Sequence, residues 1–294
     1  QTRVCPDPSV RGPGMPRGGR AAGRCGARPV QWDSSGCPAE AHVVGTPVRR
    51  GRLGRGRAML GRRSAVAMDG WTAISRAAFF RMLGRLIPTH DRPQAAALRQ
   101  PASEGVKETW GGAVFPHERR GMPWDAIPWR PRIHLGLFVH RVDGLAPGIY
   151  ALARDPDKVE ILMRVMGSDF CWQRVSTCPP GLPLYLLQEG DCRALASTVS
   201  CGQEIAGDGA FSLAMIADYM DSLATYGAAF YRNLFWEAGM VGQLLYLEAE
   251  EAGIRATGIG CYFDDPVHAA FGIASREWQS FYHFTVGAAV EDGR

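Results

Sequence analysis

Long apolar stretches are missing from this chain of 294 residues. A membrane-spanning helix needs roughly 18 or more consecutive apolar residues, and the best stretch, residues 234–247, is interrupted by Glu237 and Gln243. A signal-peptide pattern is missing as well. We therefore expect a cytoplasmic protein with no membrane partner.

Paired cysteine motifs are also missing. The eight cysteines are scattered at positions 5, 25, 37, 171, 178, 192, 201 and 261, without a Cys-x-x-Cys pair or histidines at zinc-finger spacing. Asp264 and Asp265 alone supply too few ligands for another metal, and we expect them to cap a short helix at residues 267–271. We expect no metal site and reduced thiols.

Residues 1–57 contain no Phe, Tyr, Ile, Lys or Asn, and carry eleven arginines against three acids, a net charge of +8. Since the whole chain carries +4, the rest carries −4. A segment so poor in apolar residues cannot bury enough surface to fold. With a first residue that is Gln rather than Met, we expect residues 1–57 to be a disordered or non-native leader and residues 58–294 to form the folded domain. An arginine-rich nucleic-acid arm is the alternative, but we do not expect a nucleic-acid partner.

Hydrophobic spacing in residues 58–294 predicts helices mixed with hairpin-linked strands. The expected helices cover residues 76–86 (capped by Ser75), 192–205 and 226–252, and the expected strands cover residues 133–140, 149–153, 183–187, 210–217 and 280–287. This order indicates an α+β fold rather than a repeating βαβ fold. A Gly-x-Gly-x-x-Gly motif after a strand is missing, which excludes a separate dinucleotide domain.

Short motifs follow one another from about residue 60 to the end of the chain. They are Arg-Arg-Ser at 62–64, the hairpin at 138–150, Ser-Cys-Gly-Gln-Glu at 200–204, Gly-Ile-Gly-Cys at 258–261 and the terminal segment 286–294. In this order they resemble the nitroreductase family of FMN flavoproteins and, within it, the SagB-type branch of thiazoline/oxazoline peptide dehydrogenases. The resemblance implies a three-layer α/β/α sandwich around a mainly antiparallel sheet. It also implies a homodimer, with NAD(P)H as a transient electron donor.

The resemblance assigns cofactor-binding residues. Arg62 and Ser64, with Arg63 beside them, would bind the FMN phosphate, because an arginine fork and a hydroxyl suit a dianion. Arg294 would complete that site. The backbone of Gly258, Ile259, Gly260 and Cys261 would face the flavin ring. For a lone Arg-Arg-Ser the alternative is a solvated surface run, and for the glycine turn it is a helix C-cap. We expect Cys261 to be a small packed residue.

The catalytic residue is not identified by the sequence. Where many nitroreductases have a lysine beside the flavin this chain has Val66, and Lys107 and Lys158 match no catalytic position of the branch. Arg130 and Arg132 stand where a Gly-rich loop is usual, and the four histidines at 134, 140, 268 and 283 are expected to be structural. We expect an FMN-dependent oxidoreductase that passes a hydride to or from flavin N5, acting on a heterocyclised peptide or on small nitro or quinone compounds. The alternative is a non-catalytic dimeric binding partner in a peptide-modifying complex.

Overall fold

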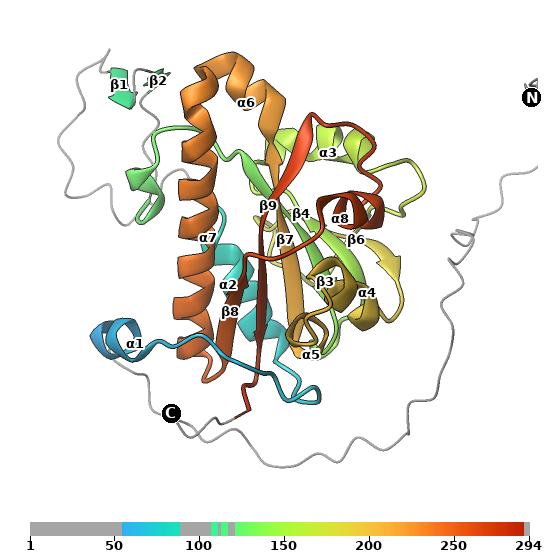
Figure 1. The fold of residues 1–294 in the computed structure, drawn as a ribbon. Helices are drawn as coiled ribbons and strands as arrows, with labels where there is room; N and C mark the ends of the chain where they lie inside the picture. The colour runs from blue at the N-terminus through green and yellow to red at the C-terminus, as the bar shows by residue number, and fades with distance from the viewer. Residues whose placement is uncertain (1–54, 89–106, 111–112, 117–120, 291–294) are drawn as a thin grey trace, which may run out of the picture. The chain divides into compact units, whose positions relative to one another are not determined.

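Antiparallel strands in the order β5-β6-β4-β3-β7-β9-β8 form the central sheet of the part of the chain that the structure describes (Figure 1). The computed structural model describes residues 55–88, 107–110, 113–116 and 121–290, all within one compact unit of the chain. The strands of the sheet are β3 (Ile133–Val139), β4 (Gly148–Leu152), β5 (Gln173–Arg174), β6 (Leu184–Glu189), β7 (Phe211–Asp218), β8 (Arg255–Ile259) and β9 (Trp278–Gly287). A separate hairpin pairs β1 (Lys107–Trp110) with β2 (Ala113–Pro116).

The two central strands are buried along their whole length. Every residue of β3 and β7 is buried, which agrees with the nearly continuous apolar runs in their sequences. Alternate side chains point to opposite faces of a strand. Leu135 and Leu213 therefore join one core cluster, while Phe138 and Ala214 join another on the opposite face.

Helices cover both faces of this sheet. Helices α2 (Arg76–Arg85) and α7 (Tyr231–Glu251) lie on one face, and α3 (Val159–Val165), α4 (Arg193–Val199), α5 (Ile205–Asp208) and α8 (Asp264–Ala270) lie on the other (Figure 1). The remaining helical segments are α1 (Arg55–Gly61), η2 (Trp124–Ala126), η3 (Pro156–Lys158), α6 (Tyr219–Tyr226) and η4 (Ala228–Phe230). The expected α+β fold, with three layers around an antiparallel sheet, is confirmed.

Several expected elements differ in extent. The helix expected at 226–252 begins only at Tyr231, because Gly227 adopts a φ of 84° and separates α7 from α6. The helix expected at 192–205 is divided into α4 and α5, because Cys201 and Gly202 adopt φ values of 58° and 70°. Strand β8 was not expected. The helix α2 is confirmed with its cap, since the Ala78 amide donates to Ser75 Oγ over 3.2 Å.

Glu237 of α7 is buried inside the domain, where it is 1% exposed. Its carboxylate accepts hydrogen bonds from Trp129 Nε1 (2.9 Å) and from the amides of Arg132 and Ile133 (3.1 Å each), and it pairs with the buried Arg154. This network joins α7 to the start of β3 and the end of β4.

Two negative findings concern the described residues alone. None of the helices in these residues is both long enough and apolar enough to cross a membrane. In the same part of the chain, His, Cys, Asp and Glu side chains do not gather in groups of three that could hold a metal ion.

Candidate functional site

The segment that carries Arg62, Arg63 and Ser64 runs along the free edge of the sheet. Ser64 and Ala256 form a parallel bridge, in which the Ala65 amide donates to the Ala256 carbonyl over 3.0 Å. Thr257 Oγ1 donates to the Ala65 carbonyl over 2.6 Å. An edge strand has unpaired amide and carbonyl groups that can hold another segment. The edge of β8 therefore fixes the Arg-Arg-Ser motif close to Gly258.

Tyr246 brings three of the expected site residues together. Its hydroxyl lies 2.8 Å from Ser64 Oγ and accepts a hydrogen bond of 2.9 Å from the Gly258 amide. The Arg62 guanidinium lies over its ring, 4.2 Å from the centroid, in a cation–π contact. The sequence pattern did not single out this tyrosine. One sequence feature could have indicated Tyr246: it places a polar hydroxyl on the apolar helix α7, and such a hydroxyl needs a hydrogen-bond partner.

The Arg-Arg-Ser motif carries positive charge, and its hydrogen-bond donors are partly exposed to solvent. Arg63 and Ser64 are exposed and Arg62 is half-buried. Arg63 donates to the Arg62 carbonyl over 3.0 Å, and the ion pairs found among the described residues do not include Arg62 or Arg63. Two guanidiniums and a hydroxyl are the donors that suit a phosphate group.

The glycines after α7 have three different roles, which corrects the expectation of a single glycine turn. Gly253, with a φ of 76°, ends α7, and the Ile254 amide then donates to the Ala249 carbonyl over 3.0 Å, as in a Schellman cap. Gly258 is a strand residue of β8, where a Cβ atom would collide with the Tyr282 hydroxyl. Gly260 is exposed and has open space where its Cβ would be. Within residues 258–261, Gly260 is therefore the glycine that leaves room for a flat ligand at the backbone.

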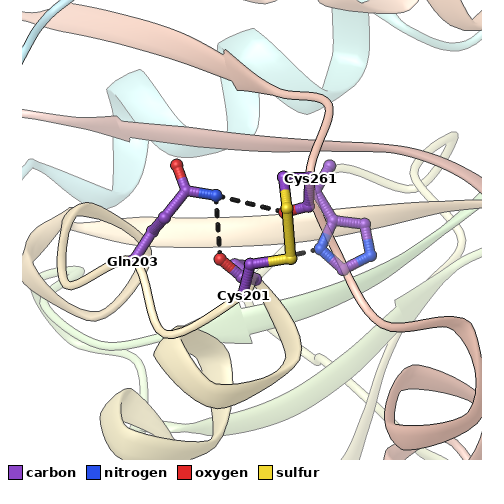
Figure 2. Close-up of a disulfide and its surroundings, with 5 residues drawn as sticks. Cys201, Gln203 and Cys261 are labelled. Atoms are coloured by element: carbon purple, nitrogen blue, oxygen red, sulfur yellow. Dashed lines mark hydrogen bonds between the residues drawn. A yellow bond between two sulfur atoms is a disulfide. The ribbon is translucent and has the colours of Figure 1, made fainter.

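Cys261 forms a disulfide with Cys201, so the expectation of reduced thiols and of a packed Cys261 is wrong for this pair (Figure 2). The two Cα atoms are 5.9 Å apart, although 60 residues separate them in the sequence. The fold brings the segment between α4 and α5 against the segment that follows β8. Scattered sequence positions cannot reveal such a pairing.

A chain of buried polar groups lies beside the disulfide. Ser200 Oγ is 3.3 Å from His283 Nδ1, and His283 Nε2 is 3.2 Å from Ser280 Oγ. The Tyr262 ring stacks on the His283 ring at a centroid distance of 4.4 Å. Burial lowers the pKa of His283 to about 3, so the imidazole is neutral at pH 7. The two serines and Tyr262 hold the His283 ring in one orientation.

The cationic residues that follow the β1–β2 hairpin do not contribute to this site. Arg130 pairs with Asp155 at 2.8 Å, and Arg132 pairs with Asp221 at 2.6 Å. Lys158 pairs with Asp218 at 2.7 Å. These charges are neutralised around the other end of β7, remote from the Arg62 motif. Arg294 and the Lys107 side chain lie outside the described residues.

Asp264 and Asp265 do not cap α8 through their side chains, contrary to expectation. The N-cap residue is Phe263, which makes no side-chain capping bond, and both aspartates lie in the first turn. Carboxylates in that position still interact favourably with the helix dipole.

The chain matches the model of the nitroreductase family over residues 184–288, from β6 to the end of β9. Among solved structures it resembles a presumed nitroreductase from Anabaena variabilis, with 20% identity, a TM-score of 0.54 and coverage of 80% of this chain and 38% of the other. The fold is that of the nitroreductases. The chain thus spans only about two fifths of the length of that protein. No curated protein matches this chain in sequence.

Two other structures are similar at lower scores. A presumed nitroreductase from Ralstonia eutropha shares 13% identity at a TM-score of 0.49, and 85% of this chain and 89% of the other are covered. A chain of the Escherichia coli microcin synthetase McbBCD complex with truncated pro-MccB17 shares 16% identity at a TM-score of 0.49, with coverage of 89% and 76%.

Proposed function

We propose that this protein is an FMN-dependent oxidoreductase whose cofactor phosphate binds to Arg62 and Ser64, with Arg63 beside them. The observation that carries this proposal is the meeting of Arg62, Ser64 and Gly258 at Tyr246, which joins two motifs separated by almost 200 residues in the sequence. The nitroreductase fold and the family match over residues 184–288 support it. Arg294 is proposed as a further phosphate ligand on the strength of the sequence resemblance.

The residues present suit both the phosphate and the flavin ring of this cofactor. The motif offers guanidinium and hydroxyl donors without a carboxylate beside them in the described residues, as a phosphate requires. The backbone of Gly258, Ile259, Gly260 and Cys261 would face the ring, where the open space at Gly260 admits a flat group. When bound, FMN would supply hydride transfer at its N5 atom. The chain's part is to hold the ring and the phosphate in one orientation.

The substrate class rests on the sequence motifs. The hairpin around Gly148 and the Ser200–Gln203 segment resemble the SagB-type branch, which favours dehydrogenation of a heterocyclised peptide over general reduction of nitro or quinone compounds. NAD(P)H would serve as a transient donor in the latter reaction. We further propose that residues 1–57 lie outside the catalytic domain, although α1 begins at Arg55.

The phosphate site is tested by comparing FMN with riboflavin, which lacks the phosphate. Charge-assisted hydrogen bonds contribute about 1.5–3 kcal/mol each, so Arg62→Ala with Ser64→Ala is expected to weaken FMN binding by roughly two orders of magnitude or more. Riboflavin binding should change little. Binding is measured by quenching of flavin fluorescence.

The matched control is Arg164→Ala, which removes an exposed arginine from α3 on the other face of the sheet. It should leave the affinity for FMN unchanged. If the double variant binds FMN as tightly as the parent protein, the phosphate does not lie at this motif. If the parent protein binds neither flavin, the non-catalytic binding partner becomes the better account.

A further inference from the structure

The Cys201–Cys261 disulfide lies at an accessible position of the described structure. Cys261 is exposed and Cys201 is half-buried. Disulfides that serve only as structural crosslinks resist reduction, whereas exposed ones are the labile or catalytic ones. The location of this bond therefore allows a thiol to reach the Cys261 sulfur.

The two segments that carry the cysteines are also held together without the disulfide. The Gln203 side-chain amide donates to the Ser200 carbonyl over 2.9 Å and to the Cys261 carbonyl over 3.1 Å (Figure 2). On the other side of the pair, the Phe263 amide donates to the Val199 carbonyl over 2.9 Å. These hydrogen bonds thus join the segment around Cys201 to the segment around Cys261.

The buried polar chain described above adds a third connection. Ser200 precedes Cys201, and Tyr262 follows Cys261; both contact the same His283 ring. If the bond opened, these contacts would keep the two sulfurs close enough to form it again. Because these contacts already join the two segments, the disulfide adds little to the stability of the fold. The bond can therefore open and close while the protein stays folded.

We propose that Cys201 and Cys261 form a redox-active pair that undergoes thiol–disulfide exchange with small thiols in the folded protein, with Cys261 as the sulfur that is attacked. This activity does not depend on the proposed flavin function. The thiolate of a small thiol attacks Cys261 Sγ, the bond to Cys201 breaks, and Cys201 Sγ leaves with the electron pair and takes up a proton. The thiolate of a second small thiol then attacks the small-thiol sulfur of the mixed disulfide, the bond to Cys261 Sγ breaks, and Cys261 Sγ leaves with the electron pair and takes up a proton. The products are two protein thiols and one small-molecule disulfide.

The difference in exposure between the two cysteines indicates which sulfur is attacked and which one leaves. Attack requires an approach to the sulfur along the direction of the S–S bond, and the rate depends on access and on the sulfur attacked. Cys261 is exposed and follows Gly260, which has open space beside it, while Cys201 is half-buried. In the reverse reaction Cys201 would attack the mixed disulfide on Cys261 and restore the pair.

The first test equilibrates the full-length protein with buffers of reduced and oxidised glutathione at pH 7.5. Free thiols are alkylated, and each cysteine is identified by peptide mass. We expect Cys201 and Cys261 to pass together from disulfide to thiols while circular dichroism stays native. Cys192 is an internal control, because it is buried and makes contacts through its sulfur to Val139 and His140.

The second test separates the two sulfurs. In Cys201→Ser, the free Cys261 should form a mixed disulfide with oxidised glutathione, with release of one reduced glutathione, roughly tenfold faster or more than Cys201 does in Cys261→Ser. The double variant Cys201→Ser, Cys261→Ser should stay folded, because the flanking hydrogen bonds remain. The proposal is overturned if the pair is reduced only when the protein is unfolded, or if the two single variants react at equal rates.

Discussion

At the scale of single residues, the buried ion pair between Glu237 and Arg154 bears directly on stability. The Arg154 side chain is fully buried and Glu237 is nearly so, and Arg154 Nε also donates to the Leu86 carbonyl over 2.8 Å. Two distant segments, the end of α2 and the start of β3, therefore depend on one carboxylate in α7.

Replacing that carboxylate leaves a buried arginine without its counter-charge. Removal of one partner of such a pair typically costs about 3–5 kcal/mol, so Glu237→Gln should lower the free energy of unfolding by about that amount in urea denaturation. The control Gln243→Ala changes an exposed residue of the same helix and should stay within about 0.5 kcal/mol of the parent. Equal stability of both variants would show that the network is not needed for folding.

The buried histidines make stability depend on pH. Burial lowers the pKa of His140 to about 4 and that of His283 to about 3, while both titrate near 6.5 in the unfolded chain. Below pH 6.5 the unfolded chain takes up protons that the folded protein does not. The free energy of unfolding is therefore greatest above pH 6.5 and falls as the pH decreases, by about 1.4 kcal/mol per pH unit for each histidine.

Replacing His283 tests how much this histidine contributes to the pH dependence of stability. Between pH 6 and pH 4.5 the free energy of unfolding should fall less in His283→Gln than in the parent protein. The difference should equal the contribution of one histidine, about 1.4 kcal/mol per pH unit. The measurement is a series of urea melts across that range. If the dependence on pH stays the same, His283 does not remain neutral in the folded protein.

At the scale of elements, the glycine inside strand β8 and the glycine that follows the strand have different roles. Gly258 packs under the Tyr282 hydroxyl of the neighbouring strand β9, whereas Gly260 faces open space. Gly258→Ala should therefore destabilise the protein by about 1–3 kcal/mol through overpacking, and Gly260→Ala should have little effect on stability. The combination of Gly258→Ala with Tyr282→Phe should recover part of the loss in thermal melts. A larger effect at Gly260 than at Gly258 would contradict this assignment.

The strands differ in how well the sequence pattern predicts them. Strands β3 and β7 could be predicted because central strands are apolar at nearly every position. Strand β8 could not, since Gly258 and Thr257 give an edge strand little hydrophobic signal, and its pairing with β9 is a long-range contact. The Cys201–Cys261 bond was missed for the same reason. The Arg62 and Ser64 positions came from a motif order, whereas Tyr246, which joins them to Gly258, became visible only through the fold.

At the scale of the whole molecule, we propose that the protein is a homodimer. Helix α7 carries three partly exposed aromatic side chains, Tyr231, Phe235 and Trp236, each between 44% and 47% exposed. Exposed apolar patches of this kind commonly mark interaction sites. Phe235→Glu is expected to shift the protein from dimer to monomer in light scattering after gel filtration, and the control Arg164→Glu should leave it dimeric. A parent protein that elutes as a monomer would contradict the proposal.

Binding of FMN at the junction of the Arg62 motif and β8 can be checked by retention of the flavin on gel filtration. The full-length protein is incubated with excess FMN, passed through gel filtration and examined by visible absorption. We predict that the protein fraction retains flavin with a band near ~450 nm, and that Arg62→Ala with Ser64→Ala elutes colourless at the same volume. A folded parent protein that elutes without flavin would contradict the account.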